Sequence, residues 1–338
     1  MTRPYHILVV RFSAMGDVAM TVPVIRALLS QNPQLKITIL TKPFFAPIYK
    51  SLPNVSVFAA DLKGRHKGVK GLYLLSKEIR QLKIEAVADL HNVLRTRILR
   101  LFLKGLPFNW IDKGRADKKA LTSGQVFEQL RTTHERYADV FKHLGFQVDL
   151  NNPTFPYERR PLPNCLKDVD NSRKLLGIAP FAAHSAKMYP LDLMQVVIED
   201  LSARYNLVLF GGSEEGETLS KIAKKYQHTV SIAGKVTFED ELSLISNLDL
   251  MVSMDSGNGH LAALYGIKVL TIWGVTHPYA GFAPFYQPMN NSLMADREKY
   301  PRIPTSIYGN KCPEGYENAA GSIHPRAVIN KVNELLKS

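Results

Sequence analysis

Residue types that can hold a phosphate group occur together in one segment, Asp255-Ser-Gly-Asn-Gly-His260. The segment follows an apolar run, residues 248–254, and leads into a helical pattern, so we predict a strand-to-helix turn. Glycine lets a backbone approach a ligand closely, and the free amides and dipole at a helix start favour an anion such as a diphosphate. The alternative is a tight turn in which Asp255 or Ser256 merely caps the helix.

A carboxylate occupies a second predicted strand-to-helix junction, Phe12-Ser-Ala-Met-Gly-Asp17. At the start of a helix, Asp17 could take a proton from a substrate hydroxyl and so act as a general base. The alternative is that Asp17 is the N-cap of the helix, with no part in chemistry. The spacing of this segment alone does not decide between the two.

Two further loops carry charged side chains, residues 181–190 with Lys187 and residues 211–217 with Glu215. Lys187 could place a cation on a leaving diphosphate, and the Glu215 carboxylate could bind the two hydroxyls of a ribose. Taken singly, Lys187 is equally explained as an exposed lysine and Glu215 as a first-turn helix acid.

The elements that must position these residues alternate between short apolar runs and helical patterns, which is typical of parallel sheets covered by helices. The predicted strands of the first half are residues 6–11, 36–41, 54–59 and 84–89. Those of the second half are residues 176–180, 206–211, 229–233, 248–254 and 268–273.

Four prolines between residues 153 and 163 indicate an extended linker between two similar α/β domains. We expect an N-terminal Rossmann-like domain over residues 1–155, a C-terminal Rossmann-like domain over 156–322, and a C-terminal helix over 323–338. Ligands of such sheets bind beyond the carboxyl ends of the strands. The predicted active site is therefore a cleft between the two domains.

The net charge of +13 is unevenly distributed. Residues 1–160 hold 26 Lys and Arg against 12 Asp and Glu, whereas the rest of the chain holds 17 against 18. The excess therefore belongs to the first half, as a solvated basic surface or as a surface for a nucleic acid, an anionic lipid or a phosphorylated saccharide.

Several classes of protein are disfavoured. No stretch approaches the roughly 18 apolar residues of a membrane span, and the N-terminus lacks the features of a signal peptide. Cys165 and Cys312 fit neither a zinc site nor a disulfide framework, so we expect a cytoplasmic protein. The histidines show no metal-ligand spacing, so we expect no metal. Walker, dinucleotide and nucleophile-elbow motifs are absent.

Taken together, the segments resemble glycosyltransferase family nine, the lipopolysaccharide heptosyltransferases. The resemblance rests on six matches in order: Ser13-Ala-Met-Gly-Asp17, Asp89-Leu-His-Asn-Val-Leu-Arg95, Lys187-Met-Tyr-Pro190, Gly211-Gly-Ser-Glu-Glu215, Asp255 to His260, and Gly274-Val-Thr-His-Pro278. Residues 285–323, rich in Tyr, Pro and Asn, match no familiar form of the family.

The resemblance implies a GT-B fold, in which two Rossmann-like domains face each other across a cleft. It also implies a metal-independent, inverting transfer of a heptose from ADP-heptose to a lipid-linked, anionic inner-core sugar at the inner face of the cytoplasmic membrane. Carried over, Asp17 is the general base. The donor diphosphate would contact Lys187, Ser256, Gly257 and His260, and the nucleoside or sugar would contact Glu215 and Asp255.

The basic first domain then suits an anionic acceptor, and Arg95 and Arg97 are the predicted acceptor contacts. Other functions remain open at this point. They are a GT-B transferase or an epimerase with another nucleotide sugar, a non-catalytic nucleotide-sugar sensor, and a nucleic-acid-binding protein. The last is disfavoured because the first half lacks interleaved aromatic and basic residues.

Overall fold

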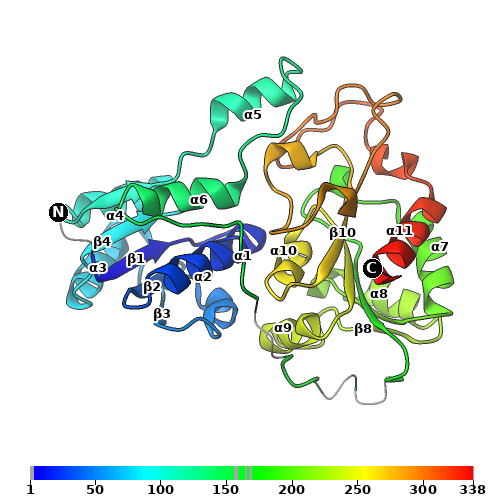
Figure 1. Cartoon of the computed structure of the whole chain (residues 1–338), viewed down its shortest axis with the longest axis horizontal. Coiled ribbons are helices and arrows are strands. Elements are labelled where there is room, and N and C mark those ends of the chain that lie inside the picture. The colour runs from blue at the N-terminus through cyan, green and yellow to red at the C-terminus, as the bar shows by residue number, and fades with distance from the viewer. Residues whose placement is uncertain (1–3, 156–158, 164–165, 167–169, 338) are drawn as a thin grey trace. The chain divides into compact units, whose positions relative to one another are not determined.

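The structure is a computed structural model that describes residues 4–155, 159–163, 166 and 170–337 (Figure 1). By its contacts the chain divides into two compact units. The first comprises Met1–Lys113 and Thr133–Thr154, and the second comprises Gly114–Thr132 and Phe155–Ser338. Residues 114–132 thus group with the second unit, although the chain on either side of them belongs to the first. The three domain limits expected from the sequence stay a prediction.

The first unit is built on a five-stranded parallel sheet in the order β3-β2-β1-β4-β5. Its strands are β1 (His6–Val10), β2 (Lys36–Thr41), β3 (Val55–Ala59), β4 (Ala86–Asp89) and β5 (Phe108–Trp110). Its helices are α1 (Met15–Ala19), α2 (Thr21–Gln31), the 3-10 helix η1 (Pro43–Tyr49), α3 (Gly68–Gln81), α4 (Leu94–Phe102) and α6 (Thr133–Lys142).

The central strand β1 is buried on both faces. Leu8 and Val10 belong to a hydrophobic core that includes residues of α3 and α4. Ile7 and Val9 are equally buried, and they point to the opposite face because successive side chains of a strand alternate. A sheet that is covered on both faces has strands made of continuous apolar residues, which explains the run Ile-Leu-Val-Val in β1.

The second unit is built on a six-stranded sheet in the order β11-β10-β9-β6-β7-β8. Its strands are β6 (Leu175–Ala179), β7 (Asn206–Leu209), β8 (Thr229–Ser231), β9 (Leu250–Met254), β10 (Lys268–Trp273) and β11 (Ser292–Met294), and the ladders between them are parallel. The α-helices are α5 (Arg115–Thr122), α7 (Leu191–Ser202), α8 (Gly216–Ala223), α9 (Phe238–Ser246), α10 (Gly257–Ala263) and α11 (Pro325–Lys337). Short 3-10 helices are η3 (Ser185–Lys187), η4 (Ser213–Glu215), η5 (Pro278–Ala280), η6 (Met289–Asn291) and η7 (Ala319–Ser322).

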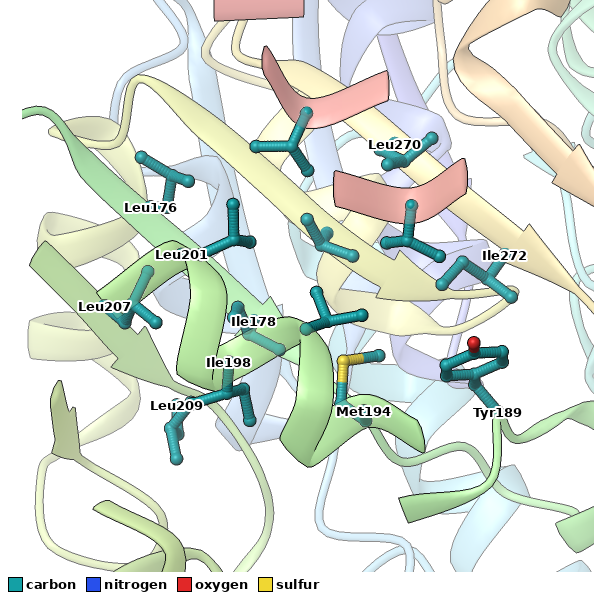
Figure 2. Close-up of a cluster of buried hydrophobic side chains, with 14 of the residues drawn as sticks. Leu176, Ile178, Tyr189, Met194, Ile198, Leu201, Leu207, Leu209, Leu270 and Ile272 are labelled. Atoms are coloured by element: carbon teal, nitrogen blue, oxygen red, sulfur yellow. The ribbon is translucent and has the colours of Figure 1, made fainter. Parts of the chain in front are cut away.

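One face of this second sheet packs against α7 and the C-terminal helix α11 (Figure 2). Leu176, Ile178 and Leu270 from the strands pack with Ile198 and Leu201 of α7 in one buried hydrophobic core. Burial of such a side chain contributes roughly 1.5–3 kcal/mol relative to its exposure to water. The final helix, α11, also belongs to this core, through Val328, Ile329, Val332 and Leu335.

The α/β class with two parallel sheets, expected from the sequence, is confirmed. Strands β5 and β11 are not among the predicted strands. Each has three residues and is partly exposed at an edge of its sheet, so neither shows the apolar run that marks a buried strand. Part of the predicted linker, including Pro156 and Cys165, lies outside the described residues. Among the described residues, no helix has the length and apolar character needed to cross a membrane.

Strand order identifies where ligands bind in each unit. In the first sheet, successive strands run one way from β1 to β3 and then resume on the other side of β1 with β4. In the second sheet, β6 to β8 run one way and β9 to β11 the other. Ligands of such sheets bind where the direction reverses. These points are the carboxyl ends of β1 and β4 in the first unit and of β6 and β9 in the second.

Candidate active site

Asp17 lies at the point of reversal in the first unit, seven residues after the end of β1 at Val10. The helix α1 begins at Met15, so Asp17 is its third residue and not its N-cap. The Asp17 Oδ2 atom accepts the backbone N–H of Ala14 at 3.2 Å and lies 2.5 Å from Nη2 of Arg11. A quarter of the Asp17 side chain remains exposed to solvent. The carboxylate is thus held in a fixed orientation and stays accessible.

Arg11, the partner of Asp17, is a buried cation that the sequence analysis did not single out. Its Nη1 atom donates to the carbonyl of Leu90 at 2.7 Å, and its guanidinium lies 5.9 Å from the ring centre of Tyr137. The Tyr137 hydroxyl in turn donates to the backbone carbonyl of Asp17. A signal was present in the sequence, because Arg11 is a charged residue at the end of an otherwise apolar buried run.

Several positively charged side chains surround His91, which follows β4 at the same end of the sheet. Burial lowers the pKa of His91 to about 3, and the positive charges around it add to this shift. These charges are those of Arg11, Lys113, Arg95 and Lys42. His91 is therefore neutral at physiological pH, and its Nδ1 atom accepts the backbone N–H of Phe12. This edge of the first sheet is an electropositive region.

The two predicted acceptor contacts differ in how they are held. Arg97 donates from Nε to the side-chain oxygen of Asn92 at 3.2 Å. Asn92 is itself fixed by Asp89, whose carboxylate accepts its backbone N–H. Arg95 is exposed in the first turn of α4 and contributes to the positive region around His91. Both arginines therefore extend the electropositive edge of the first sheet toward solvent.

In the second unit, the structure brings two of the predicted site residues together. Lys187 follows β6, Asp255 follows β9, and their Nζ and Oδ2 atoms lie 2.8 Å apart. Their side chains are only 12% and 8% exposed. The ion pair stands at the point of reversal of this sheet, where a ligand is expected. The sequence predicted that both residues line this site, and their direct pairing is a finding of the structure.

The residues after Asp255 place polar atoms beside this ion pair. The Ser256 hydroxyl is buried and has no hydrogen-bond partner among the described residues. Ser256 is the N-cap of α10 by position, yet its side chain makes no capping hydrogen bond, so the capping alternative does not hold for it. Gly257 begins α10 half-buried, and His260 is buried within the same helix. Such a hydroxyl and the amides at Gly257 can donate to an anion.

Gly259 has a packing role. A Cβ atom at this position would lie 2.5 Å from Oγ of Ser253 in β9. The glycine therefore allows α10 to pack closely on its preceding strand.

Glu215 ends the 3-10 helix η4, and its carboxylate folds back over the preceding glycines. A Cβ atom at Gly212 would lie 2.8 Å from Oε2 of Glu215, and one at Gly211 would lie 3.3 Å from its Cβ. The carboxylate has no hydrogen-bond partner among the described residues, and the side chain is half-buried. Gly212 thus makes room for the Glu215 carboxylate, which is available to a ligand's hydroxyl groups.

Glu241 is a further residue at this site that the sequence analysis missed. Its Oε1 atom accepts from Nδ2 of Asn258, the second residue of α10, at 3.2 Å. Burial raises the pKa of Glu241 to about 7, and the hydrogen bond from Asn258 opposes this shift. No local pattern distinguishes Glu241 from its acidic neighbours in Phe-Glu-Asp-Glu-Leu, because its burial depends on the packing of α9 on α10.

This burial predicts how stability responds to pH. Because the folded pKa lies above the unfolded value of 4.5, the folded chain retains a proton that the unfolded chain loses, and the free energy of unfolding falls as pH rises from about 5 to about 8. Glu241→Gln should remove this contribution. At pH 8 the variant should be more stable than the wild type by about 1–3 kcal/mol, as measured by denaturant unfolding at both pH values.

The exposed Glu217 on α8 provides the matched control. Glu217→Gln removes an exposed carboxylate and should not stabilise the protein at pH 8 as Glu241→Gln does. Parallel pH profiles for Glu241→Gln and the wild type would show that Glu241 does not titrate with a raised pKa.

Among the described residues, no group of three or more His, Cys, Asp and Glu side chains could hold a metal ion. The charged groups at both sites are instead cation–carboxylate pairs, Arg11 with Asp17 and Lys187 with Asp255.

The chain thus consists of two doubly wound parallel α/β units, each with such a pair at its point of reversal. The family model described as glycosyltransferase family 9 (heptosyltransferase) matches residues 72–310. This match spans more than half of the sequence, so the chain belongs to glycosyltransferase family 9.

Individual relatives and solved structures agree with this family assignment. The chain is similar to the lipopolysaccharide core heptosyltransferase OpsX of Haemophilus influenzae, with 24% identity over 81% of this chain and 80% of the relative. Its fold is similar to that of a family 9 glycosyl transferase from Veillonella parvula, with a TM-score of 0.77, 19% identity and coverage of 100% and 99%. It also resembles the heptosyltransferase WaaC of E. coli solved with ADP, with a TM-score of 0.68, 16% identity and coverage of 98% and 99%.

Proposed function

We propose that this chain is an inverting heptosyltransferase that transfers a heptose from ADP-heptose to an anionic, lipid-linked sugar of the lipopolysaccharide inner core. The observation that carries the proposal is the nearly buried pair of Lys187 and Asp255 beside the unpartnered hydroxyl of Ser256. Family membership and the heptosyltransferase names of the relatives support the same reaction.

Lys187 is the proposed ligand of the donor diphosphate. A lysine ammonium binds phosphate oxygens through charge-assisted hydrogen bonds, and Asp255 holds this ammonium in place before the donor arrives. Ser256, the amide of Gly257 and His260 would complete the diphosphate site. ADP, present in the WaaC structure, contains such a diphosphate.

Glu215 and Asp255 are the proposed contacts to the nucleoside and the sugar. Glu215 offers a carboxylate without a partner among the described residues, and a carboxylate can accept from two neighbouring hydroxyls of a ribose. Asp255 has one oxygen engaged with Lys187. Its other oxygen could accept a hydroxyl of the transferred sugar.

The transfer is a single displacement. The acceptor hydroxyl attacks the anomeric carbon of the heptose while the bond from that carbon to the phosphate oxygen breaks, so the configuration inverts. Asp17 takes the hydroxyl proton, and ADP leaves with the electron pair of the broken bond. Lys187 stabilises the charge that develops on the leaving phosphate, which is the kind of electrostatic contribution that preorganised groups make best.

The acceptor is proposed to bind the first unit. Arg95 and Arg97, with the positive region around His91, suit a phosphorylated or carboxylated sugar. The same surplus of charge suits the anionic surface of the inner membrane leaflet, where each basic residue contributes on the order of 1 kcal/mol. We therefore propose a peripheral location at the cytoplasmic membrane, with no nucleic acid as partner.

The test is incubation of the purified chain with ADP-, UDP- and GDP-linked sugars and core-lipid acceptors, with nucleotide release and product mass as readouts. ADP-heptose should be the best donor, and removal of acceptor phosphates should raise the acceptor KM. An arm with a chelator tests the proposal that transfer needs no metal, and activity should persist there. A better rate with a UDP or GDP sugar would contradict the proposed donor.

A further inference from the structure

Gly309, in the segment 305–311 that we call the lysine cover, lies directly on the side chain of Lys187. The contact is visible at Gly309, where a Cβ atom would lie 2.3 Å from Cδ and 2.4 Å from Cγ of Lys187. The same Cβ would also approach Cβ of His184 at 3.6 Å. The lysine cover belongs to the stretch 285–323, which carries none of the six sequence motifs, although the family model extends over this stretch as far as residue 310.

Lys187 is confined from a second direction by the loop after β10. A Cβ atom at Gly274 would lie 2.4 Å from the carbonyl oxygen of Ala186 and 3.3 Å from Cα of Lys187. The backbone N–H of Val275 also donates to the Ala186 carbonyl. The backbone of Lys187 is therefore fixed by Gly274 and Val275, while its aliphatic stem is fixed by Gly309.

The lysine cover is itself held in place by hydrogen bonds. The backbone N–H of Thr305 donates to the carbonyl of Val275 at 3.0 Å. The buried hydroxyl of Ser306 accepts the N–H of Gly309 and donates to the side-chain oxygen of Asn310, both at 3.0 Å. This network fixes the left-handed turn at Gly309, whose φ is +80°.

Apolar packing joins the same parts of the chain. Ala186, beside Lys187, shares a buried cluster with Val275 and with residues of the C-terminal stretch. Those residues are Ala295, Tyr300, Ile303 and Ala319. The stretch 285–323, which contains the lysine cover, is thus packed against Ala186 and Val275 through residues on either side of the lysine cover.

We propose that Gly309 and the lysine cover are positioning elements of the donor site, which hold the stem of Lys187 so that its ammonium stays beside Asp255 and ready for a diphosphate. The proposal rests on the proposed function of Lys187 as a phosphate ligand. A lysine stem has many rotamers, and confining it before binding removes an entropic cost from the binding step. A side chain at Gly309 would strike the middle of the stem, whose far end is tied to Asp255, so the ammonium would have to move.

The experiment compares Gly309→Ala with Gly315→Ala by calorimetry with ADP and with adenosine. Gly315 lies in the same stretch, has an equal φ of +81°, and has no atom within 4 Å of its hypothetical Cβ. Comparison of these two variants therefore separates the effect of the contact with Lys187 from the effect of backbone strain. Gly309→Ala should weaken ADP binding by about tenfold or more, the scale of one charged hydrogen bond. Adenosine affinity, and both affinities of Gly315→Ala, should stay near those of the wild type.

A double-mutant cycle tests whether Gly309 acts through Lys187. In the Lys187→Ala background, Gly309→Ala should cause no further loss of ADP affinity. An equal loss in that background, or equal effects of the two glycine variants, would overturn the proposal while leaving the proposed function intact. Absence of ADP binding by the wild type would overturn both.

Ser306→Ala provides a second variant if Gly309→Ala does not fold. It removes the hydroxyl that accepts the Gly309 N–H and adds no atoms near Lys187. ADP binding should weaken, and this loss should again disappear in the Lys187→Ala background. Unchanged ADP affinity in a folded Ser306→Ala protein would count against the lysine cover.

Discussion

Replacement of Asp17 by asparagine is expected to lower kcat for heptose transfer by at least about a hundredfold, the usual contribution of a general base. The Kd for ADP should stay nearly unchanged, because Asp17 belongs to the first unit and the proposed donor contacts to the second. Asparagine has the same size and can still accept the backbone N–H of Ala14, but it cannot take a proton from the acceptor hydroxyl. Single-turnover kinetics and ADP calorimetry measure the two quantities.

The loss of the Asp17 charge also leaves Arg11 without its anionic partner. A buried charge without its partner destabilises a protein by roughly 3–5 kcal/mol. The cost is smaller here because water reaches the side chain of residue 17, a quarter of which is exposed. Unfolding curves must therefore confirm that Asp17→Asn is folded under the assay conditions.

Asp192 offers a matched control for Asp17, since it is an exposed acid in the first turn of α7. Asp192→Asn removes the same charge from a helix start and should leave transfer unchanged. Near-normal turnover by Asp17→Asn would contradict the assignment of Asp17 as the general base.

Replacement of Lys187 by alanine is expected to weaken ADP binding by about 10- to 100-fold, because a hydrogen bond to a charged group contributes roughly 1.5–3 kcal/mol. Adenosine, which lacks the diphosphate, should bind as it does to the wild type. Calorimetry with both ligands separates loss of the phosphate contact from general damage to the nucleotide site. Unchanged ADP affinity would contradict the phosphate role of Lys187.

Two further variants control for indirect effects at Lys187. Removal of Lys187 leaves the Asp255 carboxylate buried without its cation, so Lys187→Ala/Asp255→Asn should recover stability but not ADP affinity. Lys221 on α8 is exposed and paired with Glu217. Lys221→Ala, which changes net charge equally, should leave ADP binding unchanged.

The sequence was most informative where burial imposes a simple pattern. Strands such as β1 and β9 are continuous apolar runs, and their ends show where side chains can meet a ligand. Asp17, Lys187 and Asp255 were predicted for this reason. Their partners were harder to predict, because the contact of Lys187 with Asp255 joins residues that follow β6 and β9, and the adjacency of these strands is set by the strand order.

Other features depend on packing alone. Residues 114–132 group with the second unit, where the backbone N–H of Leu130 donates to the carbonyl of Tyr279 and Lys118 lies over the ring of Phe282. Glycine at 309 is required by the nearby stem of Lys187, which is distant in sequence. Neither relation leaves a periodic or local signal in the chain, so no reading of neighbouring residues reveals it.

The mass of a core-lipid acceptor after incubation with ADP-heptose and the wild-type chain tests the central claim most directly. We predict that the acceptor gains one heptose residue and that one ADP is released for each heptose transferred. An acceptor of unchanged mass, under conditions where the chain is folded and binds ADP, would contradict heptose transfer as its function.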